Sequence, residues 1–351
     1  MIFRISGKMS GNNQKNVLVT GAAGFIGTHV VRELQKTQDE YNIVALDDLS
    51  GGFIENIPQG VTFIQGSVSD ANLITELFTK YKFEYVYHLG AYAAEGLSHF
   101  IRRFNYTNNL IGSINLINEA VKVGTKCFVF TSSIAVYGAI EPPMTEEKTP
   151  HPEDPYGISK LAVELDLMAA HSMFGLNYVI FRPHNVYGEY QNLSDPYRNV
   201  IGIFMKQIFE GQPMTIFGDG EQQRAFSYVG DIIPLIVQSP TIPGALNNVF
   251  NVGADKPYTV NELASKVAIA LGKPDHPTVH LPPRNEVGIA YSDHSKAKSV
   301  FGDSPHTSLD DGLEKMAAWA KTTTIRPLKP FTAIEVGKNM PPSWIKYLDN
   351  Q

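Results

Sequence analysis

A tyrosine and a lysine four residues apart could form an acid–base pair. Tyr156 and Lys160 lie in the segment PYGISK, and residues four apart share one face of a helix. A free tyrosine has a pKa of about 10, and a neighbouring ammonium group favours the phenolate form. The pair could therefore provide a general base near neutral pH. Because Tyr-x-x-x-Lys also arises often by chance, this interpretation needs support from other residues.

A serine could complete such a site. Ser133 ends the run Thr131-Ser132-Ser133, which follows the apolar residues 128–130. Its hydroxyl could hydrogen-bond a substrate hydroxyl and hold it toward the base. Serines also occur at strand ends without any such role, and the residue alone leaves both interpretations open.

Three glycines indicate a site for phosphate groups. Gly21, Gly24 and Gly27 have the spacing G-x-x-G-x-x-G and follow the apolar run 17–19. Glycine is needed where a side chain would block close approach of a phosphate to the backbone. The apolar residues that follow have helical spacing: Phe25, Ile26, Val30, Val31 and Leu34. The free N–H groups of a helix start, including Phe25 and Ile26, attract a pyrophosphate, so this strand–turn–helix predicts dinucleotide binding.

An acidic residue favours one type of dinucleotide. Asp47 ends the apolar run 43–46 and lies 20 residues after Gly27. A carboxylate at this position accepts hydrogen bonds from a ribose diol and repels a 2′-phosphate, which favours NAD over NADP. The alternative is a solvated acid in a turn.

The elements that must position these residues alternate along the chain. The spacing predicts an α/β fold with a Rossmann-type, doubly wound parallel sheet, whose ligands bind beyond the carboxyl ends of the strands. Expected strands are 43–46, 61–64, 85–89, 128–130, 178–181 and 248–252, and helical segments are 71–78, 109–121 and 160–171.

Proline-punctuated, shorter elements after about residue 182 predict a second, smaller mixed α/β lobe for the substrate. We expect a dinucleotide-binding domain at residues 15–185 plus 246–253 and a substrate lobe at 186–245 plus 254–321. Two terminal extensions, 1–14 and 322–351, complete the chain, and we expect the first of them to be disordered.

Composition and charge argue against several classes of protein. The 351 residues carry a formal net charge of −6 without a basic run, which argues against nucleic-acid binding. No stretch approaches the roughly 20 apolar residues of a membrane helix, and we expect no metal site. A single cysteine, Cys127, is expected to be buried in a strand and fits a reducing compartment, so we expect a cytoplasmic location.

Several motifs together resemble a known family. In order they are GAAGFIG, Asp47, FTSSIAVYG, PYGISK, RPHNVYG, IFGDGEQQRAFSYVGD and DHSKA. Over roughly residues 16–320 the chain resembles the extended short-chain dehydrogenase/reductase family, and within it the NAD-dependent nucleotide-sugar epimerases of the UDP-glucose 4-epimerase type. Relatives of this kind are commonly homodimers that pair two helices from each subunit, here 109–121 and 160–171.

The resemblance implies a role for each matching residue. It places the NAD pyrophosphate at the three glycines and the adenosine ribose at Asp47. Tyr156 is then the base, Lys160 its electrostatic partner and nicotinamide-ribose ligand, and Ser133 a second hydroxyl at the sugar. The residues implied for the substrate phosphates are Asn185, Arg224 and Arg284, and Asn109 matches an asparagine that supports the active-site helix.

The chain departs from the family pattern at several positions. Ser67 stands where the family often has an Asp near the adenine, and Ala225 replaces an acid after the diphosphate arginine. The loop 91–100 is unusual, and the sequence assigns no role to Glu95, His99, Arg102 or Arg103.

Two residues separate epimerase from dehydratase. A nucleotide-sugar 4,6-dehydratase has Asp and Glu after the strand-end hydroxyl residues, whereas this chain has Ile134 and Ala135, which cannot transfer protons. The resemblance therefore implies C4 epimerisation of a nucleotide-diphosphate hexose through a 4-keto sugar. The alternatives are a 4,6-dehydratase or another nucleotide-sugar oxidoreductase, and a non-catalytic nucleotide-binding relative.

The position three before the Asp of DHSKA often limits the room at the sugar C2 substituent in this family. It is Ala290 here, so we expect UDP-N-acetylglucosamine to be accepted as well as UDP-glucose. A nucleotide-linked uronic acid is an alternative substrate, since Arg102 or Arg103 could bind its carboxylate.

Overall fold

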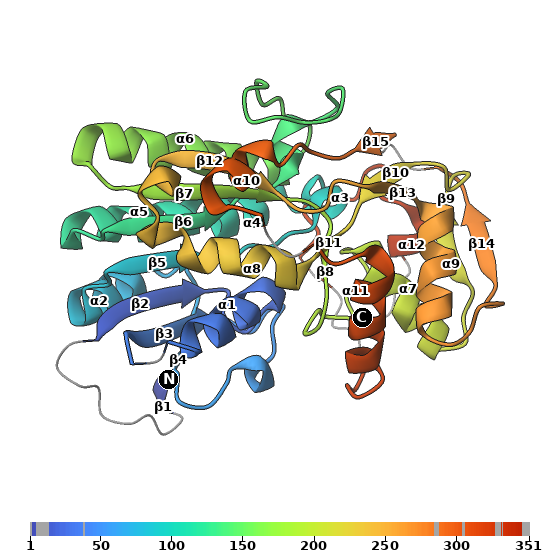
Figure 1. The fold of residues 1–351 in the computed structure, drawn as a ribbon, viewed down its shortest axis with the longest axis horizontal. Coiled ribbons are helices and arrows are strands. Elements are labelled where there is room, and N and C mark those ends of the chain that lie inside the picture. Colours follow the sequence, from blue (N-terminus) through green and yellow to red (C-terminus); the bar gives the residue numbers. More distant parts are fainter. Residues whose placement is uncertain are drawn as a thin grey trace.

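The computed structural model describes residues 2–4, 14–37, 39–283, 288–303, 306–326, 331 and 333–345. Within these ranges an eight-stranded sheet has the order β1-β4-β3-β2-β5-β6-β7-β12, and the seven strands from β4 to β12 are parallel (Figure 1). The strands are β1 Ile2–Arg4, β2 Lys15–Thr20, β3 Tyr41–Asp47, β4 Thr62–Gln65, β5 Tyr85–His88, β6 Cys127–Thr131, β7 Tyr178–Pro183 and β12 Asn248–Val252. This is the predicted Rossmann-type, doubly wound sheet.

The N-terminal extension differs in part from the expectation of disorder. Residues Ile2–Arg4 form β1, which pairs antiparallel with β4 at the edge of the sheet. The exposed edge of β4 offers unpaired backbone groups, and a short extended segment satisfies them. For these residues the prediction of disorder was wrong.

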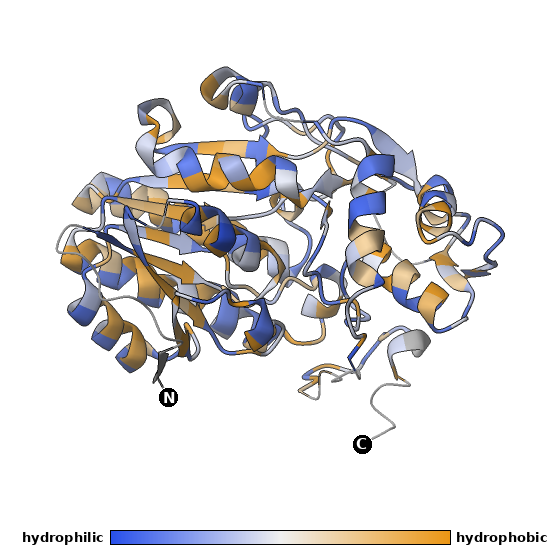
Figure 2. Cartoon of the chain, turned by 60° about the horizontal axis from the view of Figure 1, so that its bottom comes forward, coloured by the Kyte–Doolittle hydropathy of each residue, from blue (hydrophilic) through white to orange (hydrophobic). Residues whose placement is uncertain are grey.

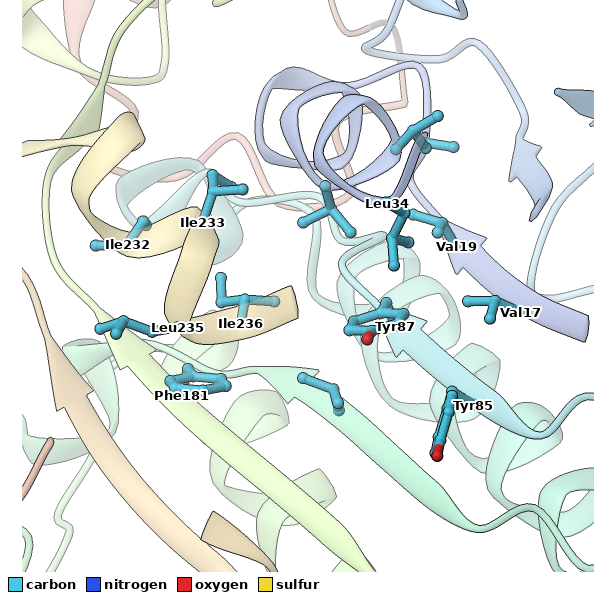
Figure 3. Packing of buried hydrophobic residues seen from close by; sticks show 14 of the residues in the cluster. Val17, Val19, Leu34, Tyr85, Tyr87, Phe181, Ile232, Ile233, Leu235 and Ile236 are labelled. Carbon is cyan, nitrogen blue, oxygen red and sulfur yellow. The ribbon is translucent and has the colours of Figure 1, made fainter. Parts of the chain in front are cut away.

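Helices cover both faces of the sheet because strand side chains alternate between them. Val17 and Val19 of β2 face one apolar cluster, with α1, α8 and α10, whereas Leu18 faces the other, with α2, α5 and α6. Figure 3 shows the first cluster between the sheet and α1 and α8. The helices are α1 Phe25–Gln35, α2 Ala71–Tyr81, α5 Gly112–Val123, α6 Pro155–Phe174, α8 Val229–Gln238 and α10 Ser295–Phe301.

A third apolar cluster lies beyond the sheet, in the part of Figure 1 that carries α7, α9 and α11. Its large buried side chains include Tyr187 and Phe204. The elements here are β8 Val186–Tyr187, α7 Val200–Phe209, β9 Met214–Phe217, β10 Gln223–Ala225, β11 Ser227–Tyr228, β13 Pro257–Thr259, α9 Val260–Ala270, β14 Thr278–Leu281, β15 Ile289–Ala290 and α11 Leu309–Ala320.

Short helices fill the connections between these elements. They are η1 Ile54–Asn56, α3 Glu95–Ser98, α4 Arg102–Asn105, the π-helical η2 Tyr106–Ile111, η3 Ile134–Tyr137, η4 Ser239–Thr241, η5 Pro243–Ala245 and α12 Pro342–Ile345. The last lies in the irregular C-terminal stretch.

The distribution of apolar and polar residues follows the arrangement of sheet and helices. Figure 2 shows largely apolar central strands between helices that present hydrophilic residues outward. Cys127 is buried in β6, as expected, and burial raises the pKa of its thiol to about 12. In the described part of the chain, no helix combines the length and the apolarity that crossing a bilayer requires.

Candidate active site

A cleft of about 450 Å³ opens at the carboxyl ends of the parallel strands, and the turn between β2 and α1 forms one of its walls. Gly21 has a φ of +66°, and a Cβ there would lie 2.6 Å from the Cα of Gly90. A Cβ on Gly27 would lie 2.0 Å from the carbonyl oxygen of Gly21. A side chain at either position would therefore collide with backbone.

The start of α1 leaves donors for an anion. Gly24 is the N-cap of the helix, and no side chain caps it. The first N–H groups of a helix have no intrahelical acceptor, and Phe25 and Ile26 supply two of them beside the cleft. Free donors, the positive end of the helix dipole and the close glycine turn fit a pyrophosphate.

Asp47 stands at the end of β3, beside this turn. Its carboxylate accepts hydrogen bonds from the backbone N–H of Ala23 at 3.0 Å and of Leu49 at 2.8 Å. Burial raises the pKa of the carboxyl, and these donors oppose that effect. Asp47 lines the cleft together with Ser67, so its carboxylate is placed to meet a ribose diol.

A larger cavity of about 1780 Å³ adjoins the cleft, and Ser133, Asn185 and Glu95 line both. Tyr156 and Lys160 line the cleft. Ser133 therefore lies where the two cavities meet, and Tyr156 and Lys160 lie on the cleft side of it.

The helix α6 carries Tyr156 and Lys160. Its N-cap is Asp154, whose carboxylate accepts hydrogen bonds from the N–H groups of Tyr156 and Gly157. The Nζ of Lys160 donates to the carbonyl oxygen of Thr131 at 2.7 Å and lies 5.8 Å from the centroid of the Tyr156 ring. The predicted sharing of one helix face is thus present.

Burial controls the ionisation of this pair. It raises the pKa of Tyr156 far above its usual value, and a hydrogen bond with the Ser133 hydroxyl opposes the rise. Burial also lowers the pKa of Lys160 to about 7, against the attraction of Glu164. The expectation that the ammonium group lowers the tyrosine pKa neglected desolvation, which penalises both charges.

Two of the three residues expected at the substrate phosphates, Asn185 and Arg224, line the larger cavity. Asn185, at a φ of +40°, donates from Nδ2 to the carbonyl oxygen of Ala225 at 3.1 Å. Arg224 on β10 is the register partner of Ala290 on β15, and both line the cavity. Arg224 donates from Nη1 to the carbonyl oxygen of Gly288 at 3.1 Å. Arg284 lies outside the described residues.

Ile134 and Ala135 line the larger cavity directly after Ser133. The cavity therefore presents aliphatic groups at the two positions that carry acids in a dehydratase.

A buried ion pair beneath the site escaped the sequence analysis. Glu164 is fully buried, and its carboxylate accepts from Nε of Arg182 at 2.9 Å and from Nη2 at 2.5 Å. Arg182 also donates to the Tyr137 hydroxyl, and the Ser132 hydroxyl donates to Glu164. Glu164 lies four residues after Lys160, and Arg182 is charged within an apolar strand, which are the signals that could have revealed the pair.

The unusual loop after β5 is attached to the catalytic helix. Asn109 accepts from the Tyr92 N–H at 2.8 Å, and its amide donates to the Asn105 side chain at 2.8 Å. Asn105 in turn donates to the carbonyl oxygen of Pro155 at the start of α6. Asn109 therefore reaches α6 through Asn105.

Of the unassigned loop residues, Glu95 and His99 line the larger cavity. Arg102 and Arg103, considered for a uronate, line neither cavity. Among the described residues, no group of three or more His, Cys, Asp or Glu side chains could hold a metal ion.

Comparison with known proteins adds a family to this geometry. The model of the NAD dependent epimerase/dehydratase family matches residues 17–253. A UDP-glucose 4-epimerase of Mycolicibacterium smegmatis is 34% identical over 307 residues, which cover 85% of this chain and 96% of that protein.

Two solved structures have the same fold. UDP-glucose 4-epimerase of Thermotoga maritima, with UDP-glucose, has a TM-score of 0.83 at 34% identity. UDP-N-acetylglucosamine 4-epimerase of Methanobrevibacter ruminantium has a TM-score of 0.82 at 31% identity. Each covers 88% of this chain and 99% of the other. With a matching family model, a shared fold and a cleft built for a dinucleotide, this chain belongs to the NAD dependent epimerase/dehydratase family, in its group of UDP-sugar 4-epimerases, and its cofactor is NAD.

Proposed function

We propose that the chain epimerises a nucleotide-diphosphate hexose of the UDP-glucose/UDP-galactose type at C4, through a 4-keto sugar. The observation that carries this proposal is that Ser133 lines both the dinucleotide cleft and the larger cavity, while Tyr156, its hydrogen-bond partner, and Lys160 line the cleft. A sugar at this junction can reach both the base and the cofactor.

Tyr156 accepts the proton of the sugar 4-hydroxyl and later returns it. Ser133 hydrogen-bonds the same hydroxyl and also the Tyr156 hydroxyl, which aligns donor and acceptor. Lys160, anchored on the Thr131 carbonyl, offers its remaining N–H groups to the nicotinamide ribose. NAD supplies hydride acceptance and return at C4. The Gly21–Gly24–Gly27 turn and Asp47 hold the pyrophosphate and the adenosine ribose.

Inversion requires the sugar to present its other face while the diphosphate stays bound. Arg224 and Asn185 line the larger cavity, and we propose them, with Arg284, as the groups that hold the diphosphate. A planar guanidinium makes paired hydrogen bonds to phosphate oxygens. A cavity of about 1780 Å³ supports this proposal, because it gives a hexose room to turn.

A 4,6-dehydratase is the second candidate on this fold. It eliminates water across C5 and C6, which needs additional proton-transfer groups near the sugar. Ile134 and Ala135 stand at the positions concerned, and neither has an ionisable group. This favours epimerisation.

The purified protein, without added cofactor, should convert UDP-glucose and UDP-galactose into one another, with products identified by NMR. Conversion without added NAD is expected, because the cofactor should stay bound to the protein and is regenerated within each turnover. A 4-keto-6-deoxy product would instead establish the dehydratase, and net release of NADH would establish a dehydrogenase.

We also propose that the sugar pocket accepts an N-acetyl group at C2. Ala290 is small, and it adjoins Arg224 in the parallel pair of β10 and β15. Replacing Ala290 by Tyr should lower turnover of UDP-N-acetylglucosamine much more than turnover of UDP-glucose. An unchanged ratio of the two rates would contradict this assignment.

We further propose two lobes with the bounds given above, a cytoplasmic location and a homodimer. Ile158 and Leu165 on α6 are 40% and 58% exposed, and Ile111 at the end of η2, directly before α5, is 50% exposed. Such side chains on adjacent helices suit pairing with a second copy. Light scattering should give twice the mass of one chain.

A further inference from the structure

We propose that residues 333–345 form the outer wall of the cavity assigned above to the nucleotide sugar, and that Trp344 is a specificity-determining residue that contacts this ligand. The inference rests on the proposed function of that cavity. The C-terminal stretch lies well beyond the family match, which ends at residue 253.

Backbone hydrogen bonds attach this segment to the unusual loop. The N–H groups of Glu335 and Val336 donate to the carbonyl oxygen of Phe100 at 2.8 and 3.2 Å. The Glu335 carboxylate accepts from the backbone N–H of Arg103 at 2.7 Å and of Phe104 at 2.8 Å. Hydrogen bonds to a charged acceptor are stronger than neutral ones, so Glu335 anchors the segment to α4.

Aromatic packing provides the second attachment. Trp344 is 6% exposed and packs edge-on against Phe100, at 6.1 Å between ring centroids, and against Tyr197, at 5.2 Å. A Cβ on Gly96 would lie 3.2 Å from the Trp344 ring, so the indole lies close against the backbone of α3. The packing of these rings fixes the position of the indole.

The attached segment faces the ligand space. Five of its residues line the larger cavity: Val336, Lys338, Asn339, Pro341 and Trp344. The same cavity is lined by Ser133, Arg224 and Ala290. None of residues 333–345 lines the dinucleotide cleft. A ligand held between Arg224 and Ser133 therefore shares its cavity with this segment, whereas bound NAD does not.

The segment also supports the loop that approaches the catalytic tyrosine. Glu95 and Ser98 belong to α3, and the Ser98 hydroxyl donates to Asp154, the N-cap of the helix that carries Tyr156. The α3 backbone thus lies between Trp344 on one side and the start of α6 on the other. Weakening the outer attachment should therefore loosen the sugar side of the site.

The sequence offers a direct reporter, because its two tryptophans are Trp319 and Trp344. Trp319 lies on α11 near Tyr190, and it does not line the larger cavity. In the NAD-loaded full-length Trp319→Phe variant, adding UDP-glucose should change the emission of Trp344. The matched Trp344→Phe variant, which retains Trp319, should respond little.

Kinetics provide the second readout. Trp344→Ala should raise the KM for UDP-glucose roughly fivefold or more, with a smaller change in kcat and unchanged NAD content. Ile345→Ala is the matched control, because this neighbouring side chain is 40% exposed and does not line the cavity.

The outcomes separate this inference from the proposed function. Suppose the parent epimerises UDP-glucose, folded Trp344→Ala keeps the parent's KM, and the emission of Trp344 does not change when the sugar is added. The assignment of residues 333–345 to the cavity wall would then be refuted, and the proposed epimerase activity would be supported. If the parent does not convert UDP-glucose but the emission of Trp344 still responds to it, the cavity-wall assignment would be supported and the proposed reaction would be refuted.

Discussion

The two adjoining cavities are built in different ways. The lining of the dinucleotide cleft comes mainly from residues at or just after the ends of the parallel strands β2, β3, β4, β5, β6 and β7, with further residues from α6 and from the loop 190–199. The larger cavity is enclosed by segments that are distant in sequence, around residues 95–100, 133–144, 183–185, 217–224, 281–283, 290 and 336–344. The first is therefore determined by the sheet, whereas the second depends on how loops and the C-terminal segment pack.

This difference has a chemical consequence. A cofactor that serves every turnover needs one fixed geometry, which strand ends and a tight glycine turn provide. A sugar that must rotate within its site needs space. Loops provide this space, and their sequences can vary without altering the sheet. Substitutions on the cleft side should therefore affect chemistry or folding, and substitutions on the cavity side should affect recognition and pH dependence.

The largest effect is expected from the base at the junction. Tyr156→Phe removes the hydroxyl that accepts the sugar proton, and kcat should fall about a thousandfold, while NAD remains bound. Tyr81→Phe, on α2, is the control and should keep its activity. Kinetics and the NAD content of both proteins measure this, and near-normal turnover by Tyr156→Phe would refute the acid–base assignment.

The next largest effect is expected on the stability of the dinucleotide-binding sheet. Arg182→Met leaves the fully buried Glu164 carboxylate without its partner, and breaking a buried pair costs about 3–5 kcal/mol of unfolding free energy. Lys266→Met breaks the exposed pair with Asp310, which should change stability by less than about 1 kcal/mol. Denaturant unfolding measures both, and equal losses would contradict the assigned difference between the pairs.

A smaller loss is expected at the glycine turn. A Cβ on Gly27 would lie 2.0 Å from a backbone oxygen, and such overpacking typically costs about 1–3 kcal/mol. Gly27→Ala should therefore lower both thermal stability and NAD content. Gly244→Ala is the control, because its Cβ would lie 3.6 Å from Val300, an ordinary contact. Full NAD content in Gly27→Ala would show that the turn tolerates a side chain.

The same difference explains what the sequence could predict. Gly21, Asp47, Ser133 and Tyr156 lie in local motifs at strand ends or a helix start, where period and spacing determine position. The parallel strands and the doubly wound class of the sheet followed from the same alternation of apolar runs and helices.

The remainder depends on contacts between distant parts of the chain. The Glu164–Arg182 pair joins residues 18 apart, and Glu335 meets the backbone of Arg103 across 232 residues. No local period encodes such contacts. The direction of the Tyr156 pKa was missed for a related reason, because desolvation depends on the complete burial of the site.

The smallest effect should be a shift in pH dependence, caused by a residue that lines both cavities. The Glu95 carboxylate contributes to raising the pKa of Tyr156, after burial. Glu95→Gln removes that charge, so the tyrosine pKa falls and more phenolate is present at a given pH below it. The rising limb of log kcat against pH should therefore move to lower pH. Glu153→Gln is the matched control, since Glu153 lines the same cavity but is not among the charges that act on Tyr156. A limb that stays in place in Glu95→Gln, or moves to higher pH, would show that the loop and the catalytic helix are electrostatically independent.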